Sequence, residues 1–388
     1  MFERVFKIFS SLRLTVVCLA FGVVLVFFGT LAQVNEGLYL AQSRWFRSFF
    51  IWWGPAGGGF KMPIFPGGYL IGCVLLLNLI AAHVKRFKFT WKKAGINITH
   101  LGIILLLAGQ LATDMLSREM QVQFLPGETK AYSESPRQSE LVFLTDAADP
   151  KQDEVISIPE SMVKNSEEIH NPSLPFTVRV KEYHVNADLR QRGPVVDKGP
   201  APATEGFGTS LVMTPAPEIR STEERNMPSA ILELTGPQGT LGTWLVSTIL
   251  NEPQSFSIGN KIWRVALRFQ RQYLPYTIKL LSVKHDVYPG TDIPKDYQSR
   301  VRIENPTRGE NREVDIYMNN PLRYQGLTYY QSQMSGEEIN GRPDSSVLQA
   351  VHNPSWLTPY VGCVLVGGGM VIQFLMHLVG FISKRRKA

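Results

Sequence analysis

The chain has 388 residues, of which 44% are hydrophobic, and a formal net charge of +7. Residues 1–115 and 356–388 together hold 15 Lys and Arg against 3 Asp and Glu, whereas residues 116–355 hold 25 against 30. A nucleic-acid-binding domain carries its basic residues on the folded domain itself. The distribution therefore excludes a nucleic-acid partner and places the positive charge beside the apolar parts of the chain.

Four segments are almost wholly apolar, and each is close to the roughly 20 residues that cross a bilayer as a helix. They are Leu14–Val34, Gly67–Val84, Gly95–Met115 and Leu357–Ile382. The first is not expected to be a cleaved signal peptide, because no Ala-x-Ala site follows it and three more spans exist. The sequence predicts four transmembrane α-helices in contact with membrane lipid.

Clusters of Lys and Arg predict the orientation of these helices. The clusters are Arg4, Lys7 and Arg13; Lys85, Arg86, Lys88, Lys92 and Lys93; and Lys384 to Lys387. All of them lie on one side of the membrane if both termini are cytoplasmic. We expect a multi-pass protein of the bacterial inner membrane, with residues 356–388 forming the fourth helix and a basic cytoplasmic tail, and the 116–355 domain in the periplasm.

An aromatic segment, residues 38–53, follows the first apolar segment. Trp and Phe at this density are typical of the headgroup region of a membrane. The segment predicts a short helix that lies flat on the outer surface. A helix that caps the large domain from below is the alternative.

The large middle part, residues 116–355, has the period-2 pattern of half-buried β-strands. The clearest runs are Phe176–Val185, Ala230–Thr235, Lys261–Phe269, Tyr276–Val283, Ser299–Ile303 and Glu313–Tyr317. Gly-Pro, Asn-Pro and Pro-Gly pairs separate them. We expect a mostly-β extracytoplasmic domain built as an antiparallel sandwich or open barrel.

A turn is predicted where Asn319, Pro321, Tyr324 and Gly326 follow one another within eight residues. Asn-Pro followed by a nearby Gly is typical of a tight connection between strands. Gly326 is expected to have φ > 0 or a close backbone neighbour. A docking surface for another protein is the alternative role of this stretch.

The three cysteines, Cys18, Cys73 and Cys363, all lie in apolar segments. No Cys-x-x-Cys is present, which excludes thiol–disulfide exchange by this chain itself. No Cys-x-x-Cys-His is present either, so covalent haem is not expected. The chain also lacks the motifs of nucleophilic and phosphate-binding enzymes, and we predict no catalytic residues.

Three histidines, His83, His100 and His377, lie near the predicted cytoplasmic ends of three helices. His100 and His377 are each seven residues, or about 10 Å of helix, from the flanking basic cluster. Ionisable residues at this depth are uncommon and usually face a bundle interior or a site. Imidazole is also a standard axial ligand of haem iron. A side chain that merely snorkels to the interface is the alternative for each of them.

Residues 273–334, which end in NNPLRYQGLTYYQSQM, resemble the periplasmic block of the ResB/CcsB family of cytochrome c biogenesis proteins. The opening helix SLRLTVVCLAFGVVLVFFGTLAQ, the second helix LNLIAAHVKRFKF and the third helix KKAGINITHLGIILLLAG are also similar to that family. The resemblance is weakest over residues 135–225. Because a tryptophan-rich motif is missing and the chain ends after the fourth helix, it is expected to be an unfused member.

The resemblance implies a subunit of a System II haem delivery and holocytochrome c synthase complex. A CcsA-type membrane protein would be its partner, apocytochrome c its target, and other proteins would supply reduced thiols. His83 matches the family's transmembrane haem ligand, so haem b would bind transiently and without a covalent bond. His100 and His377 are weaker candidates, and Lys85 and Arg86 are candidates to pair with the haem propionates.

Two other functions are compatible with the sequence. The first is a structural adaptor in a different membrane complex that binds no haem. The second is a transporter of another substrate. Four spans without an internal repeat or a broken helix argue against an autonomous transporter.

Overall fold

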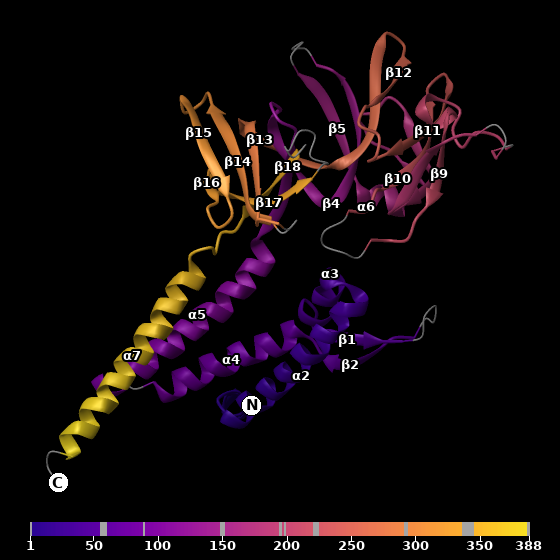
Figure 1. The fold of residues 1–388 in the computed structure, drawn as a ribbon. Coiled ribbons are helices and arrows are strands. Elements are labelled where there is room, and N and C mark those ends of the chain that lie inside the picture. The colour runs from indigo at the N-terminus through magenta and orange to yellow at the C-terminus, as the bar shows by residue number, and fades with distance from the viewer. Residues whose placement is uncertain are drawn as a thin grey trace. The chain divides into compact units, whose positions relative to one another are not determined.

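The computed structural model describes residues 2–54, 60–87, 90–147, 152–193, 196–197, 199–219, 225–290, 294–335 and 345–385. The chain divides into two compact units. The first comprises Met1–Arg118 and His352–Ala388, and the second comprises Glu119–Ile219 and Glu223–Val351. The first unit is mainly helical, and the second consists mainly of strands (Figure 1).

Four helices among the described residues are long and apolar enough to cross a membrane, as the sequence predicts. They are α2 (Leu12–Glu36), α4 (Gly68–Arg86), α5 (Ala94–Leu116) and α7 (Thr358–Arg385). The short helix α1 (Phe2–Phe9) precedes α2, and a 3-10 turn, η2 (Trp91–Lys93), precedes α5.

Asn78 holds α4 against the corner between α1 and α2. Its side-chain amide donates to the carbonyl oxygens of Phe9 (2.6 Å) and Ser11 (3.1 Å), and its Oδ1 accepts from the Thr15 hydroxyl (2.6 Å). Asn78 is only 1% exposed. Interhelical hydrogen bonds of this kind hold helices together where the surroundings are apolar. They fix the position of the last two turns of α4, which carry His83.

Glycines bring α5 and α7 into close contact along their length, and Figure 1 shows the two helices side by side. Gly95, Gly102 and Gly109 are buried and recur every seven residues on α5. A Cβ added at Gly102 would lie 2.8 Å from the Val366 Cγ2, and one at Gly95 would lie 2.7 Å from the Gln373 Cβ. Small residues at an interface let helix backbones approach closely in this way.

The aromatic segment 38–53 is helical only in its first part, so the prediction of a single short helix is wrong for its second part. A four-residue helix, α3 (Leu38–Ala41), continues into a π-turn, η1 (Gln42–Phe46), and the chain then forms strand β1 (Phe50–Trp53), which pairs with β2 (Met62–Pro66). Aromatic and β-branched residues favour strands. Ile51 is fully buried between exposed neighbours, which is the alternation of a strand.

Sixteen described strands follow α5 along the chain. They are β3 (Arg118–Phe124), β4 (Thr129–Asp146), β5 (Asp153–Pro159), β6 (Glu168–Ile169), β7 (Thr177–His184), β8 (Ala187–Gln191), β9 (Leu211–Pro215), β10 (Ser229–Gly236), β11 (Gly239–Ser247), β12 (Gln254–Ile258), β13 (Lys261–Val287), β14 (Pro294–Asn305), β15 (Glu310–Tyr317), β16 (Leu322–Tyr324), β17 (Leu327–Ser335) and β18 (Ser345–His352). A short helix, α6 (Glu160–Asn165), and a 3-10 turn, η3 (Gly206–Thr209), interrupt them.

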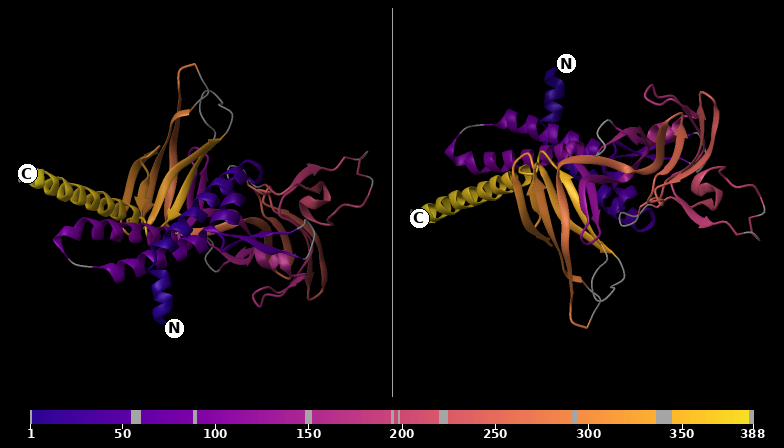
Figure 2. Two further views of the ribbon diagram at one scale, coloured as in Figure 1. Left: turned by 90° about the horizontal axis from the view of Figure 1, so that it is seen from below. Right: turned by 90° about the horizontal axis from the view of Figure 1, so that it is seen from above.

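Ten of these strands form one sheet in the order β15-β14-β13-β4-β3-β18-β17-β16, with β12 beside β13 and β5 beside β4. The two end strands are consecutive in the chain, and an isolated antiparallel bridge between Tyr317, the last residue of β15, and Asn320, two residues before β16, lies in the turn that connects them, so the sheet is nearly closed. Figure 2 shows from two directions that the second half of β13 and strands β14 to β18 lie together, whereas the first half of β13 pairs with β12. A second sheet has the order β11-β10-β7-β6. The mostly-β domain that the sequence predicts is confirmed, and of the two predicted forms, an antiparallel sandwich or an open barrel, its large sheet resembles the barrel.

The predicted strand runs are present, but two of them are halves of one strand. The runs 261–269 and 276–283 both lie in β13, which is 27 residues long. Its register against β4 shifts between Tyr273 and Ile278, around Pro275. Proline has no N–H to donate to a sheet ladder, so the pairing is interrupted while the chain stays extended.

The tyrosine-rich block lies in one of the domain's hydrophobic cores. The hydroxyls of Tyr276 and Tyr329 are 2.6 Å apart, and Tyr324 packs edge-on against Tyr276 with ring centroids 4.8 Å apart. Burial raises the pKa of Tyr329 well above its usual range. The Tyr324 hydroxyl also accepts from the Asn305 amide (2.9 Å) and donates to Glu310. These tyrosines hold β13, β16 and β17 together, which is a structural role.

Gly326 forms the turn between β16 and β17. Tyr324 pairs with Leu327, which leaves Gln325 and Gly326 as a two-residue hairpin loop. Their φ angles are 50° and 79°, and Asn319 also has a positive φ of 64°. Two successive residues with φ > 0 are typical of the type I′ turn, whose twist matches that of the strands. The left-handed conformation that the sequence predicts for Gly326 is confirmed.

We predict that Gly326→Val lowers the free energy of unfolding of the β domain by about 1–3 kcal/mol, because a β-branched residue is strained at this φ. Thermal unfolding of the purified protein measures the change. Gly326→Asn is the matched control, since Asn tolerates the left-handed region. An unchanged midpoint for Gly326→Val would contradict the prediction.

A second prediction concerns the contact between α5 and α7. A Cβ at Gly369 would lie 2.6 Å from the Thr99 backbone nitrogen, whereas one at Gly368 would meet nothing within 4 Å. Gly369→Leu is therefore expected to destabilise the helix pair by about 1–3 kcal/mol, the usual cost of overpacking. Size-exclusion chromatography in detergent should show less folded protein for Gly369→Leu, and Gly368→Leu should match the wild type. Equal yields of the two variants would argue against the close contact.

Candidate functional site

Two of the three predicted histidines meet where α4 and α5 lie against each other. The rings of His83 and His100 have centroids 6.1 Å apart and an angle of 41° between their planes. Phe87, one turn beyond His83, lies 5.4 Å from the His83 ring. Both histidines are half-buried. The structure thus brings together two imidazoles that are 17 residues apart in the sequence.

The hydrogen bonds of these rings leave nitrogen atoms available. His100 Nδ1 lies 2.8 Å from the carbonyl oxygen of Ile96. A carbonyl only accepts, so Nδ1 donates and Nε2 is the unprotonated nitrogen of the neutral ring. Metal-binding histidines are commonly oriented by such a bond on the other ring nitrogen. Within the described ranges, the His83 side chain has no hydrogen-bond partner.

A cavity of about 390 Å³ lies beside His83. Its lining residues are His83, Phe87, Thr90, Trp91, Ala94, Asn97, Ile98 and Leu101. Most of these side chains are apolar, and the volume falls in the range of roughly 300–1,000 Å³ that is usual for ligand pockets. The cavity, called the His83 cavity below, has the composition needed to cover a flat apolar molecule next to an imidazole.

The predicted propionate partners are less well placed. Lys85 Nζ donates to the Ser10 hydroxyl (3.0 Å), and Lys85 is not among the residues that line the His83 cavity. Side chains two residues apart on a helix point to nearly opposite faces, so the side chains of His83 and Lys85 point in different directions. The Arg86 side chain lies outside the described part of the structure, so its role stays a prediction.

His377 has a different neighbourhood. The Gln373 side-chain amide, one turn earlier on α7, donates to His377 Nε2 (2.8 Å). His377 is exposed and does not line the His83 cavity. A role for it as a ligand stays a prediction that this geometry does not support. Among the described residues there is also no cluster of three or more His, Cys, Asp or Glu side chains able to hold a metal ion.

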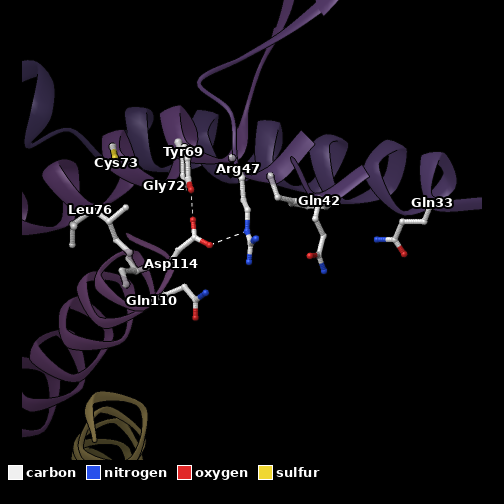
Figure 3. A pocket seen from close by; sticks show the side chains of 13 residues that line it. Gln33, Gln42, Arg47, Tyr69, Gly72, Cys73, Leu76, Gln110 and Asp114 are labelled. Carbon is white, nitrogen blue, oxygen red and sulfur yellow. Dashed lines mark hydrogen bonds and ion pairs between the residues drawn. The ribbon is translucent and has the colours of Figure 1, made fainter. Parts of the chain in front are cut away.

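A polar cluster that the sequence analysis missed lies at the opposite end of the same helix pair (Figure 3). Asp114, near the end of α5, forms an ion pair with Arg47 (Nε to Oδ1, 2.8 Å) and accepts a hydrogen bond from the Tyr69 hydroxyl at the start of α4. The Asp114 side chain is 11% exposed. An acidic residue inside an apolar helix was the signal that could have revealed this cluster.

A single register between α4 and α5 accounts for the contacts at both ends of this helix pair. Seven residues are close to two helical turns, so each step of seven returns to nearly the same face. Steps from His83 along α4 reach Leu76 and then Tyr69, while steps from His100 along α5 reach Leu107 and then Asp114. Leu76 and Leu107 line one cavity, and Tyr69 and Asp114 are hydrogen-bonded. The helices are therefore antiparallel neighbours over about 21 Å, from the histidine pair to the Asp114 cluster.

These features define a class of protein: a chain with four helices able to cross a membrane, a large β domain, and an apolar cavity lined by one histidine that packs against a second. Comparison with known proteins narrows the class. Residues 238–342 match the model of the ResB-like family. This range contains the tyrosine-rich block on which the sequence resemblance depended.

A curated relative is the protein NrfI of Wolinella succinogenes, which is 28% identical over 102 residues. The aligned part makes up 26% of this chain and 11% of that protein, so the chain matches only a small share of its relative. Together, the two matches support the assignment of the chain to the ResB-like family. The family-level resemblance noted in the sequence is confirmed.

Proposed function

We propose that this chain is a membrane subunit of the machinery of cytochrome c biogenesis, and that it holds haem b as a transient, non-covalent cargo. The observation that carries the proposal is the apolar cavity lined by His83, whose ring packs against His100, in a chain whose residues 238–342 match the ResB-like family. A CcsA-type partner would complete the complex and deliver haem to apocytochrome c.

The residues of the His83 cavity fit the chemistry of haem. Neutral imidazole nitrogen is a standard ligand of haem iron, and His83 has a ring without a described hydrogen bond. Phe87, Trp91, Ile98 and Leu101 supply apolar cover for a porphyrin ring. His100 is the better placed of the two weaker candidates for a second nitrogen, because it lies against His83 whereas His377 is bonded to Gln373.

On this proposal, the contribution of the protein is to position the haem. Haem supplies the vinyl groups that are to be joined to reduced cysteines of the apocytochrome, and other proteins supply the reducing equivalents. His83 would hold the iron and the apolar side chains of the cavity would cover the ring, which would lower the entropic cost of the later encounter. The β domain would dock the partner or the apocytochrome.

The proposal includes an orientation in the bacterial inner membrane. The basic clusters beside α1, between α4 and α5 and after α7 favour cytoplasmic termini and a periplasmic β domain. Alkaline phosphatase folds into an active enzyme only outside the cytoplasm. A fusion after Gln238 is therefore expected to be active and a fusion after Ala388 inactive. The reverse pattern of activities would overturn the orientation and place the histidine pair at the periplasmic face.

The haem-ligand proposal is tested by His83→Ala in the complex purified with its partner. Loss of the axial nitrogen should remove the haem absorbance band and abolish holocytochrome c formation, while both proteins remain in the membrane. Added imidazole should restore part of the haem binding, because a small ligand can occupy the iron position vacated by the side chain.

His377→Ala is the matched control, and it is expected to keep the haem band because His377 lies on α7 away from the His83 cavity. His100→Ala is expected to shift or weaken the band. If His83→Ala keeps a normal haem spectrum and full maturation activity, the ligand assignment fails. If both purified proteins lack haem altogether, the adaptor function is favoured instead.

A further inference from the structure

A second cavity of about 430 Å³ lies at the Asp114 end of the α4–α5 pair (Figure 3). Its wall combines apolar side chains from α4 and α5, including Leu76, Leu107 and Leu111, with polar groups from four elements. Nothing in the proposed haem site uses it. It is called the Arg47 cavity below.

The Arg47 cavity has an excess of hydrogen-bond donors. A guanidinium carries five N–H groups, and Arg47 forms an ion pair with Asp114 through Nε at 2.8 Å. Neither terminal nitrogen has a hydrogen bond to a described residue, and the Arg47 side chain is 51% exposed. Figure 3 shows the two terminal nitrogens pointing into the space beside the side chain of Gln42. Gln33 and Gln110 line the same cavity and bring two more carboxamides.

The carboxylate that lines the cavity is already paired. Asp114 forms the ion pair with Arg47 and accepts a hydrogen bond from the Tyr69 hydroxyl. What remains is a guanidinium edge and three amides above an apolar wall. That combination matches a molecule with an apolar body and a carboxylate, because arginine binds carboxylates with paired, charge-assisted hydrogen bonds.

We propose that the Arg47 cavity is a second ligand site that binds the propionate carboxylates of a porphyrin. The naming of a porphyrin rests on the proposed function, whereas the preference for an amphiphilic carboxylate rests on the cavity alone. The site lies about 21 Å along the helix pair from His83. On this proposal the facing sides of α4 and α5 bind iron at the His83 end and carboxylates at the Arg47 end.

The test uses iron-free protoporphyrin IX, which keeps both carboxylates but offers no iron to a histidine. The full-length protein in nanodiscs of zwitterionic lipid is titrated and porphyrin fluorescence is recorded. The dimethyl ester of protoporphyrin, which lacks the carboxylates, is titrated in parallel. We expect the free acid to bind at least about tenfold more tightly, the usual effect of losing a charged hydrogen bond. Equal affinities for acid and ester would overturn the proposal.

Three variants separate binding from a structural role of the cluster. Arg47→Gln should weaken binding of the free acid about tenfold and leave the ester unchanged. Asp114→Asn should keep or strengthen binding, because it removes the negative charge that competes for Arg47. Arg44→Gln is the matched control, since Arg44 lies on the same segment, pairs with Glu36 and does not line the Arg47 cavity. If Arg47→Gln and Asp114→Asn weaken binding equally, the cluster is only structural and the proposal fails.

Two further measurements test whether the anion in the cavity belongs to a porphyrin or to a lipid headgroup, and whether the site is independent of His83. Adding phosphatidylglycerol to the nanodiscs should leave porphyrin binding in place; complete displacement would assign the cavity to a lipid headgroup and overturn the porphyrin assignment. His83→Ala should leave the binding of iron-free porphyrin unchanged. Loss of that binding in His83→Ala would show that the probe occupies the His83 cavity and would also overturn the proposal. The haem-ligand proposal is tested separately, by the haem absorbance band of His83→Ala.

Discussion

The antiparallel contact between α4 and α5 is the constraint on which both candidate sites depend. One register places His83 opposite His100 and, four helical turns away, Tyr69 opposite Asp114. A shift of either helix by one residue rotates its face by about 100° and separates both pairs at once. The hydrogen bond from Tyr69 to Asp114 and the ion pair with Arg47 therefore help to hold the two imidazoles together at the other end.

Polar residues within the apolar helices are few, and each described one in this region has a partner or lines a cavity. Asn78 uses its amide and its carbonyl to tie α4 to the preceding helices. Asp114 is paired with Arg47, whereas the His83 side chain lines the His83 cavity and the half-exposed Arg47 side chain lines the Arg47 cavity. An unsatisfied polar group is expensive away from water, so such groups point to sites for ligands.

Much of the architecture followed from the sequence because length and hydropathy alone decide whether a helix can cross a bilayer. The sequence also placed His83, His100 and His377 near the ends of apolar helices, and they lie near the ends of α4, α5 and α7. The pairing of His83 with His100 rather than His377 did not follow from the sequence, since it depends on which helices are neighbours. The glycines of α5 settle this point by directing α7 to a different face of α5. Strand β1 was missed because a four-residue alternation inside an aromatic run gives little signal.

The long helices of the first unit form two closely packed pairs, α2 with α4 and α5 with α7. The candidate sites lie along the boundary between the two pairs. Asn78 holds α4 to the corner of α1 and α2, and glycine contacts hold α5 to α7. Both cavities lie where α4 faces α5, at the two ends of that boundary. Close-packed pairs resist internal rearrangement. We therefore expect a flat ligand to be admitted by a small separation of the two pairs, and the Arg47–Asp114–Tyr69 contacts are the polar interactions that such a separation would strain.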